Sequence, residues 1–339
     1  MTVVVDKFGG SVLRRPEDIA AAVSAVAEQR DAGLRPVVVV SAFEGVTDAI
    51  LASAAVLLPD GGAAIREPGH DADSTFARET DRALSTGEAL SAALFALGLQ
   101  ARGIPARSFS GAEAGIRTAA GHLGAEVRRV VPRRLRAALG EGLVPVVAGF
   151  QGIGAHGELT TLGRGGTDLS AVVLAVALRA ARCELFKDVG GVMEADPHLV
   201  PAARLLPEVD ARQLELLAAM GAEVVHPVAV RRARRGRMPL EVRALQSDAP
   251  RTVVVPGRGR QRPAGRLMLA VDRKGAIARV SVVGPASLLP DLLPIPAHGA
   301  GTFDDGGWRV AWSEVPAEQA AFAARAVHAA LMASAEGGR

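Results

Sequence analysis

The stretch "VVVDKFGGSVLRR", residues 3–15, sets the architecture expected of this chain. A run of mostly β-branched residues ends at Lys7, and two glycines, Gly9 and Gly10, follow. An apolar run of this length, closed by glycine, predicts a buried strand. Lysine and arginine together number 39, and the lysines among them are Lys7, Lys187 and Lys274. We therefore expect a strand that brings one of few lysines to a glycine-rich turn.

Similar apolar runs alternate with helical patterns through the first 250 residues. The strands are predicted at 2–8, 35–43, 143–153, 183–192 and 240–245, and the helices at 16–33, 47–58, 88–103 and 167–180. Strands that are apolar almost throughout are typical of a parallel sheet covered on both faces. The pattern predicts an α/β fold, a three-layer αβα sandwich with a mostly parallel sheet.

Glycine-rich turns follow most of these strands. They lie at 8–11, 149–154, 163–166 and 189–191. Ligands of parallel sheets bind outside the carboxyl ends of the strands. We therefore expect these turns to converge at one edge of the sheet.

The pattern changes near residue 250. The segment 251–266 is rich in Pro, Gly and Arg and is predicted to be a linker. Two strands (277–284 and 308–315) and a helix (316–333) are expected after it. The predicted domains are residues 1–250, the linker 251–266 and a small α+β unit over 267–335.

The composition excludes several classes of protein. Hydrophobic residues make up 49% of the chain and charged residues 22%, with a net charge of +3, as in an ordinary globular protein. The arginine clusters at 128–136 and 230–237 lack interleaved aromatic residues, which favours solvated helix faces over a nucleic-acid site. A single cysteine excludes a disulfide framework. Without a predicted leader or bilayer-spanning run, we expect a cytoplasmic protein with no membrane partner.

Two motifs suit the binding of anions. In "KFGGS" (7–11), a cation and flexible backbone N–H groups at a strand end suit phosphates, although a tight turn with a solvated lysine explains the motif equally well. In "TTLGRGGTDLSAVVL" (160–174), a glycine loop precedes a helix that Thr167 or Asp168 is expected to cap. The carboxylate of Asp168 could orient a lysine or bind a metal ion, and the guanidinium of Arg164 could bind a carboxylate. An N-capped helix with an incidental arginine is the alternative.

Two further motifs place polar residues at the predicted ends of strands or helices. The pattern of "FKDVGGVMEADP" (186–197) predicts a strand followed by a loop that faces a ligand. "STGEALSA" (85–92) places Glu88 at a predicted helix start, where a glutamate is favourable by itself.

Seven motifs in one order resemble the amino acid kinase family, and within it the aspartokinases. They are "KFGGSVL" (7–13), "VVVVSAFEGVT" (37–47), "STGEALSA" (85–92), "GFQG" (149–152), "TTLGRGGTD" (160–168), "FKDVGGVMEADPH" (186–198) and "GAEVVHP" (221–227). The resemblance covers roughly residues 2–248. It implies transfer of the γ-phosphoryl group of Mg·ATP to the side-chain carboxylate of aspartate or a similar amino acid.

The resemblance also implies residue roles. The catalytic residues would be Lys7 and Asp168. The phosphate and nucleotide would bind Gly9, Gly10, Ser11, Gly165, Gly166, Lys187, Asp188, Gly191 and Asp196. The amino acid would bind Ser41, Thr47, Glu88, Phe150 and Arg164. ATP and Mg²⁺ are the implied cofactors, with no metal held by protein side chains, and a homodimer is expected. The C-terminal part resembles a reduced form of the family's regulatory ACT module.

Departures from the family pattern leave a second interpretation open. They include Lys187 for Thr, Gly190 for Asp, Met193 for Tyr, His198 for Arg and Glu223 for Lys. The alternative is a catalytically altered homologue. It would be an amino-acid-binding pseudokinase or partner subunit, or an enzyme with another donor or another transferred group.

Overall fold

The computed structural model describes residues 2–57, 75–245, 250–257, 266–289, 293, 295 and 298–336. It divides into two compact units. The first unit comprises Met1–Val189 and Gly236–Pro250, and the second comprises Gly190–Arg235 and Arg251–Arg339. The segment Gly190–Arg235 thus groups with the C-terminal residues, whereas the sequence division placed it before the linker. The domain limits given above remain a prediction.

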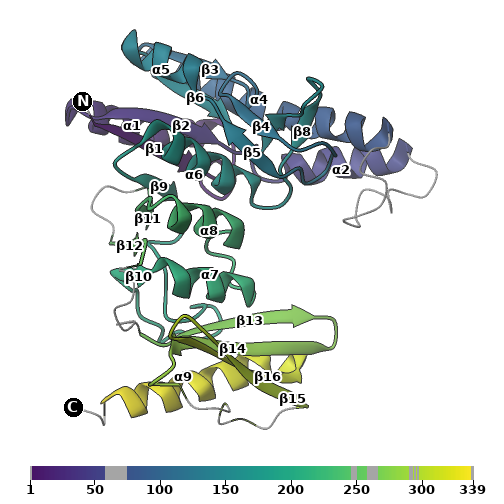
Figure 1. The fold of residues 1–339 in the computed structure, drawn as a ribbon, viewed down its shortest axis with the longest axis vertical. Coiled ribbons are helices and arrows are strands. Elements are labelled where there is room, and N and C mark those ends of the chain that lie inside the picture. Colours follow the sequence, from purple (N-terminus) through teal and green to yellow (C-terminus); the bar gives the residue numbers. More distant parts are fainter. Residues whose placement is uncertain are drawn as a thin grey trace. The chain divides into compact units, whose positions relative to one another are not determined.

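The first unit is built on a parallel sheet (Figure 1). In spatial order its strands are β11 (Leu240–Arg243), β9 (Cys183–Phe186), β1 (Val3–Phe8), β2 (Arg35–Val40), β6 (Val144–Ala148) and β3 (Ala106–Phe109). Every pairing between neighbours in this order is parallel. The α/β prediction with a mostly parallel sheet is confirmed.

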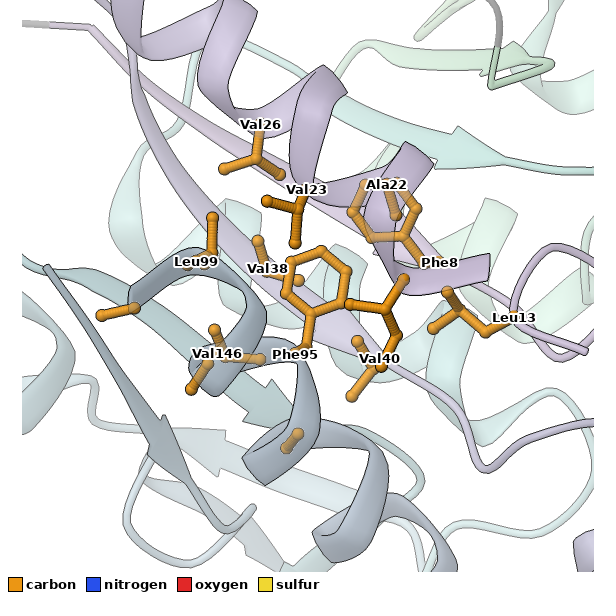
Figure 2. Close-up of a cluster of buried hydrophobic side chains, with 14 of the residues drawn as sticks. Phe8, Leu13, Ala22, Val23, Val26, Val38, Val40, Phe95, Leu99 and Val146 are labelled. Carbon is orange, nitrogen blue, oxygen red and sulfur yellow. The ribbon is translucent and has the colours of Figure 1, made fainter. Parts of the chain in front are cut away.

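Helices cover both faces of this sheet. On one face, α1 (Ile19–Asp31) and α4 (Thr75–Ala101) pack on side chains that include Phe8 and Val40 (Figure 2). The Phe8 ring stacks on Phe186 and also contacts Phe95 of α4, with ring centroids 4.6 Å and 5.3 Å away. On the other face lies α6 (Gly166–Leu178), which Lys7 meets. Neighbouring residues of β1 therefore serve different layers, because strand side chains alternate between faces.

The remaining elements of the first unit are short. They are η1 (Pro16–Asp18), α2 (Val46–Leu57) and α5 (Arg133–Gly140), with a small sheet of β5 (Val127–Val130), β4 (Ile116–Thr118), β7 (Gln151–Ile153) and β8 (Leu159–Thr161). The strand predicted over 143–153 is two strands, β6 and β7. The chain turns between them because Phe150 has a φ of +65°, a conformation that an extended strand does not contain.

The second unit contains a parallel pair, two helices and an antiparallel sheet. The pair is β10 (Glu208–Asp210) with β12 (Arg251–Val255), and the helices are α7 (Ala211–Ala219) and α8 (Pro227–Arg235). The sheet is β13 (Met268–Lys274), β14 (Ile277–Pro285), β16 (Trp308–Pro316) and β15 (Gly299–Asp305), followed by η2 (Ala317–Gln319) and α9 (Ala320–Glu336). Among the described residues, no helix combines the length and hydrophobicity needed to cross a bilayer.

The C-terminal sheet has two strands more than the sequence predicted. Strand β15 was missed because Gly299 and Gly301 weaken the strand signal, yet the indole ring of Trp312 lies against Gly301 and takes the space of a side chain. Strand β13 was missed because it follows directly on the predicted linker. Residues 251–255 of that linker form strand β12.

Candidate active site

Lys7 lies near the carboxyl end of β1 and is 5% exposed. Its ammonium Nζ lies 2.7 Å from Oδ1 of Asp168. Burial lowers the pKa of Lys7, and the carboxylate of Asp168 opposes this change. Gly9 makes room for the ammonium, since a Cβ at Gly9 would lie 2.7 Å from Nζ. The lysine is thus a buried, partnered cation, and a solvated lysine at a tight turn is excluded.

Asp168 lies in the first turn of α6. This helix begins at Gly166 after Gly165, which has a φ of +70°. The prediction that Thr167 or Asp168 caps the helix is wrong, because glycine alone takes this left-handed conformation without strain and the helix starts earlier. Burial raises the pKa of Asp168, but the charges of Lys7 and Lys187 outweigh it and hold the pKa below its usual range.

Lys187 follows β9 and brings a second cation to the same carboxylate. Its Nζ lies 3.3 Å from Oδ2 of Asp168. Its backbone N–H donates to the carbonyl of Arg243, 2.9 Å away, which fixes it beside β11. Two of the chain's three lysines therefore meet at one buried carboxylate, where the ends of β1 and β9 approach the start of α6.

Glu88 lies in the interior of the 27-residue helix α4, so its predicted place at a helix start is wrong. The helix starts earlier because Ala77 and Leu84 bury apolar side chains in the preceding turns. Oε1 of Glu88 accepts a hydrogen bond from the N–H of Ala42 at 3.0 Å, and Oε2 has no hydrogen-bond partner among the described residues. Burial raises the pKa of Glu88 to about 7. The site thus holds a buried carboxylate oxygen for which the described part of the chain supplies no hydrogen-bond partner.

The other residues predicted to bind the amino acid lie on different elements of the first unit. Ser41 follows β2, and its N–H donates to the carbonyl of Phe8 at 3.0 Å. Thr47 lies in the first turn of α2. The N–H of Phe150 donates to the hydroxyl of Ser170 in α6 at 3.1 Å. Arg164 is exposed on the loop before α6 and forms no ion pair with the described residues.

Three of the four predicted glycine turns lie together. A Cβ at Gly149 would lie 2.5 Å from Cγ2 of Thr167, and one at Gly166 would lie 2.9 Å from the Phe150 ring. The turns 149–154 and 163–166 therefore pack tightly, and Lys7 joins the turn 8–11 to them through Asp168. Gly10 is half-buried and Ser11 is exposed within that turn.

The residues predicted to bind the nucleotide beyond Lys187 divide between the units. Asp188 is exposed at the end of the first unit. In the second unit, Gly191 is buried, and a Cβ there would lie 2.4 Å from the hydroxyl of Thr252. The carboxylate of Asp196 accepts the N–H of His198 at 2.9 Å. Gly191 is thus close to Thr252 and Asp196 has a local partner, and the nucleotide roles of both residues remain a prediction.

Sequence reasoning missed one buried carboxylate near the site, that of Asp81 in α4. The available signal was its spacing, because Asp81 precedes Glu88 by seven residues and so shares its face of the helix. Among the described residues, no cluster of three or more His, Cys, Asp or Glu side chains is arranged to hold a metal ion.

Known proteins share sequence with most of this chain. Residues 1–244 match the model of the amino acid kinase family. The aspartokinase of Mycolicibacterium smegmatis is 38% identical over 304 residues, which cover 89% of this chain and 67% of that protein. The aspartokinase of Thermus thermophilus is 41% identical over 254 residues, or 75% of this chain and 59% of that protein. The chain therefore spans about three fifths to two thirds of the length of these relatives.

Solved structures show the same fold. The aspartokinase III of E. coli aligns with 97% of this chain and all of that chain, at a TM-score of 0.78 and 22% identity. The aspartate kinase of Synechocystis aligns with 97% of this chain and 55% of that chain, at a TM-score of 0.62 and 33% identity. The family model matches well over half of the residues of this chain. The chain belongs to the amino acid kinase family.

Proposed function

We propose that this chain is an aspartokinase-like phosphotransferase. It transfers the γ-phosphoryl group of Mg·ATP to the side-chain carboxylate of aspartate or a similar amino acid. The curated relatives reported above are named aspartokinases, and the structure of E. coli aspartokinase III is described as a complex with aspartate and ADP. No observation on the described residues favours the pseudokinase or another donor.

The arrangement of Lys7, Asp168 and Lys187 carries the proposal. Two ammonium groups and one carboxylate leave one net positive charge at the N-terminus of α6, whose dipole also favours an anion. Gly9 keeps the backbone beside Lys7 open, because a Cβ there would collide with the ammonium. This combination of cations and glycine backbone fits a polyphosphate.

The chain's residues then act by position and charge. Bound Mg·ATP supplies the electrophilic phosphorus and a metal charge, and the Mg²⁺ would be held chiefly by the phosphates. Lys7 and Lys187 neutralise phosphoryl oxygens, while Asp168 holds both ammonium groups in place. Ionised Glu88 receives the ammonium of the amino acid, and Arg164 receives its α-carboxylate. The attacking carboxylate is already ionised at neutral pH, so no general base is needed.

Three further expectations accompany this function. We infer a homodimer and a cytoplasmic location from the resemblance and the composition. We also infer that the sheet β13–β16 with α9 is a reduced ACT-like module. Size-exclusion chromatography with light scattering tests the first, and cell fractionation tests the second.

An acyl phosphate can be trapped to test the reaction. With Mg·ATP, aspartate and hydroxylamine, the protein should form aspartyl hydroxamate. Lys7→Met should remove the product, and Lys187→Met should lower kcat by about 100-fold, because each loses a cation that stabilises developing charge. Lys274→Met is the matched control, since this third lysine is exposed on β13 and, within the described residues, pairs with Asp272 alone.

The result also decides against the alternatives. No hydroxamate from a panel of amino dicarboxylates would contradict the proposal. Calorimetry with the amino acid and with Mg·ATP would then show whether the chain is an amino-acid-binding pseudokinase, which would bind the amino acid alone.

A further inference from the structure

Asp81 is a fully buried carboxylate that lies outside the predicted set of site residues. It accepts the backbone N–H of Thr161 at 3.0 Å and the hydroxyl of the same residue. It also accepts the N–H of Leu123 at 3.2 Å, and Nδ1 of His122 lies 2.8 Å from its Oδ2. One side chain of α4 thus binds two other segments, the end of β8 and the loop 121–124.

The loop 121–124 has a backbone that needs such support. Gly121, Leu123 and Gly124 have φ values of +102°, +58° and +145°. A positive φ is unfavourable for a leucine, and such a conformation persists only where surrounding contacts enforce it. The carboxylate of Asp81 supplies these contacts at His122 and Leu123 directly.

Both segments lead to the loop that carries Arg164. Thr161 precedes Arg164 by three residues, and its carbonyl accepts the N–H of Ala125 at 2.8 Å. A Cβ at Gly163 would lie 3.3 Å from Cα of Gly124, so the two loops are in close contact. The loop 121–124 therefore supports the loop 162–165 from one side.

Asp81 and Glu88 are separated by about two turns on the same face of α4. We propose that Asp81, with His122, is a positioning residue that fixes the loop bearing Arg164 relative to the helix bearing Glu88. This sets the spacing between the two charges that would hold the carboxylate and the ammonium of the amino acid. The inference rests on the proposed function for the identity of that substrate.

A carboxylate is required because every partner of Asp81 can donate. Two N–H groups, one hydroxyl and one ring nitrogen face its two oxygens. In Asp81→Asn, the amide NH₂ would replace one acceptor with a donor and leave buried N–H groups without a partner. The loops would then lose their fixed position while α4 itself stays intact.

The test compares Asp81→Asn with Ser91→Ala, a buried change on the same helix; among the described residues, the hydroxyl of Ser91 donates to the carbonyl of Gly87 alone. Asp81→Asn should raise KM for aspartate by at least about tenfold and change KM for Mg·ATP by less than about twofold. Ser91→Ala should change neither KM. An equal rise in both KM values, or no change in either, overturns the proposal.

Substitutions of His122 keep the test decisive if Asp81→Asn does not fold. His122→Leu should raise KM for aspartate selectively, and His122→Asn should restore it, because the asparagine amide can donate from near the position of Nδ1. If the two variants behave alike, His122 has no part in positioning.

Hydrogen exchange separates this inference from the proposed function. Should the wild-type protein act on no amino dicarboxylate, the proposed function fails, and the amide exchange of Leu123 and Thr161 decides the positioning role. Faster exchange at these two amides in Asp81→Asn, with exchange of the α4 amides unchanged, supports it. Unchanged exchange at both refutes it.

Discussion

Glu88 shows at the scale of a residue how burial changes a carboxylate. Its side chain is 3% exposed, and one of its oxygens has no hydrogen-bond partner in the described chain. Loss of hydration disfavours the charged form and raises its pKa to about 7. The group therefore changes charge within the physiological pH range, whereas an exposed glutamate would not.

This pKa predicts a pH dependence for the amino-acid substrate. Below about pH 7 the carboxyl of free Glu88 is protonated and cannot pair with an ammonium group, so kcat/KM for aspartate should rise as the pH rises through about 7. In Glu88→Gln this rise should vanish, and kcat/KM should fall at least tenfold at pH 8, an order-of-magnitude loss for a charged hydrogen bond. Steady-state kinetics from pH 5.5 to 9 measure both effects. A rise of unchanged midpoint in Glu88→Gln would assign it to another group.

At the scale of the secondary-structure element, the neighbouring strands β1 and β9 each carry one buried carboxylate. Asp6 and Glu184 are register partners, and both are fully buried. Arg182 and Arg243 pair with Glu184, at 2.6 Å and 3.2 Å. Burial, and then the charge of Glu184, raise the pKa of Asp6 well above its usual value. The pair of strands therefore holds a proton that the unfolded chain releases at a lower pH.

The raised pKa of Asp6 makes the stability of the protein depend on pH. The native state binds more protons than the unfolded state, so the free energy of unfolding falls as the pH rises from the ordinary aspartate range towards the raised pKa. Asp6→Asn should flatten this fall and make the variant more stable than the wild type at the alkaline end. Its amide oxygen can still accept the bond from Gln29.

Urea unfolding between pH 4 and pH 8 measures this effect. Asp48→Asn, an exposed aspartate in α2, is the control and should keep the wild-type pH dependence. If Asp6→Asn loses stability with pH as the wild type does, the raised pKa of Asp6 is not its cause.

At the scale of the whole molecule, distant segments share the core of the second unit. Ala195, Val200 and Ala203 pack in one cluster with side chains of β14, β16 and α9. Beside them, the buried carboxylate of Glu194 lies 3.3 Å from Nε of Arg204 and 3.5 Å from Nε2 of His328 in α9. The C-terminal module is therefore part of the packing of the segment that carries the "MEADPH" motif.

Removal of residues 267–339 should consequently unfold this segment. Ala195, Val200 and Ala203 would lose their apolar partners, and Glu194 would lose His328. We expect rapid amide exchange and proteolytic cleavage between residues 193 and 205 in the truncated protein, while the strands β1 and β2 stay protected. Hydrogen exchange measured by mass spectrometry checks this, and unchanged protection of 193–205 would show that the segment folds without the module.

Much of the fold could be predicted because its signals are local. The apolar runs that became β1 and β2, and the helix that became α6, follow from hydrophobic periodicity. Lys7 and its glycine turn were found for the same reason. The split at Phe150, the interior position of Glu88 and strand β15 were missed. Each depends on how side chains pack in the folded protein, as when the indole ring of Trp312 lies against Gly301.

The order of β1, α1, β2, β6, α6, β9 and β11 along the chain could thus be predicted from the sequence, because hydrogen bonding and side-chain periodicity act over a few residues. The meeting of Lys7 and Lys187 at Asp168 was not, since it joins residues up to 180 positions apart. The same holds for Asp81 and its partners on β8 and the loop 121–124. The burial of these groups and the distances between them determine their charge states and their contacts. Burial and distance are fixed only when the layers pack together.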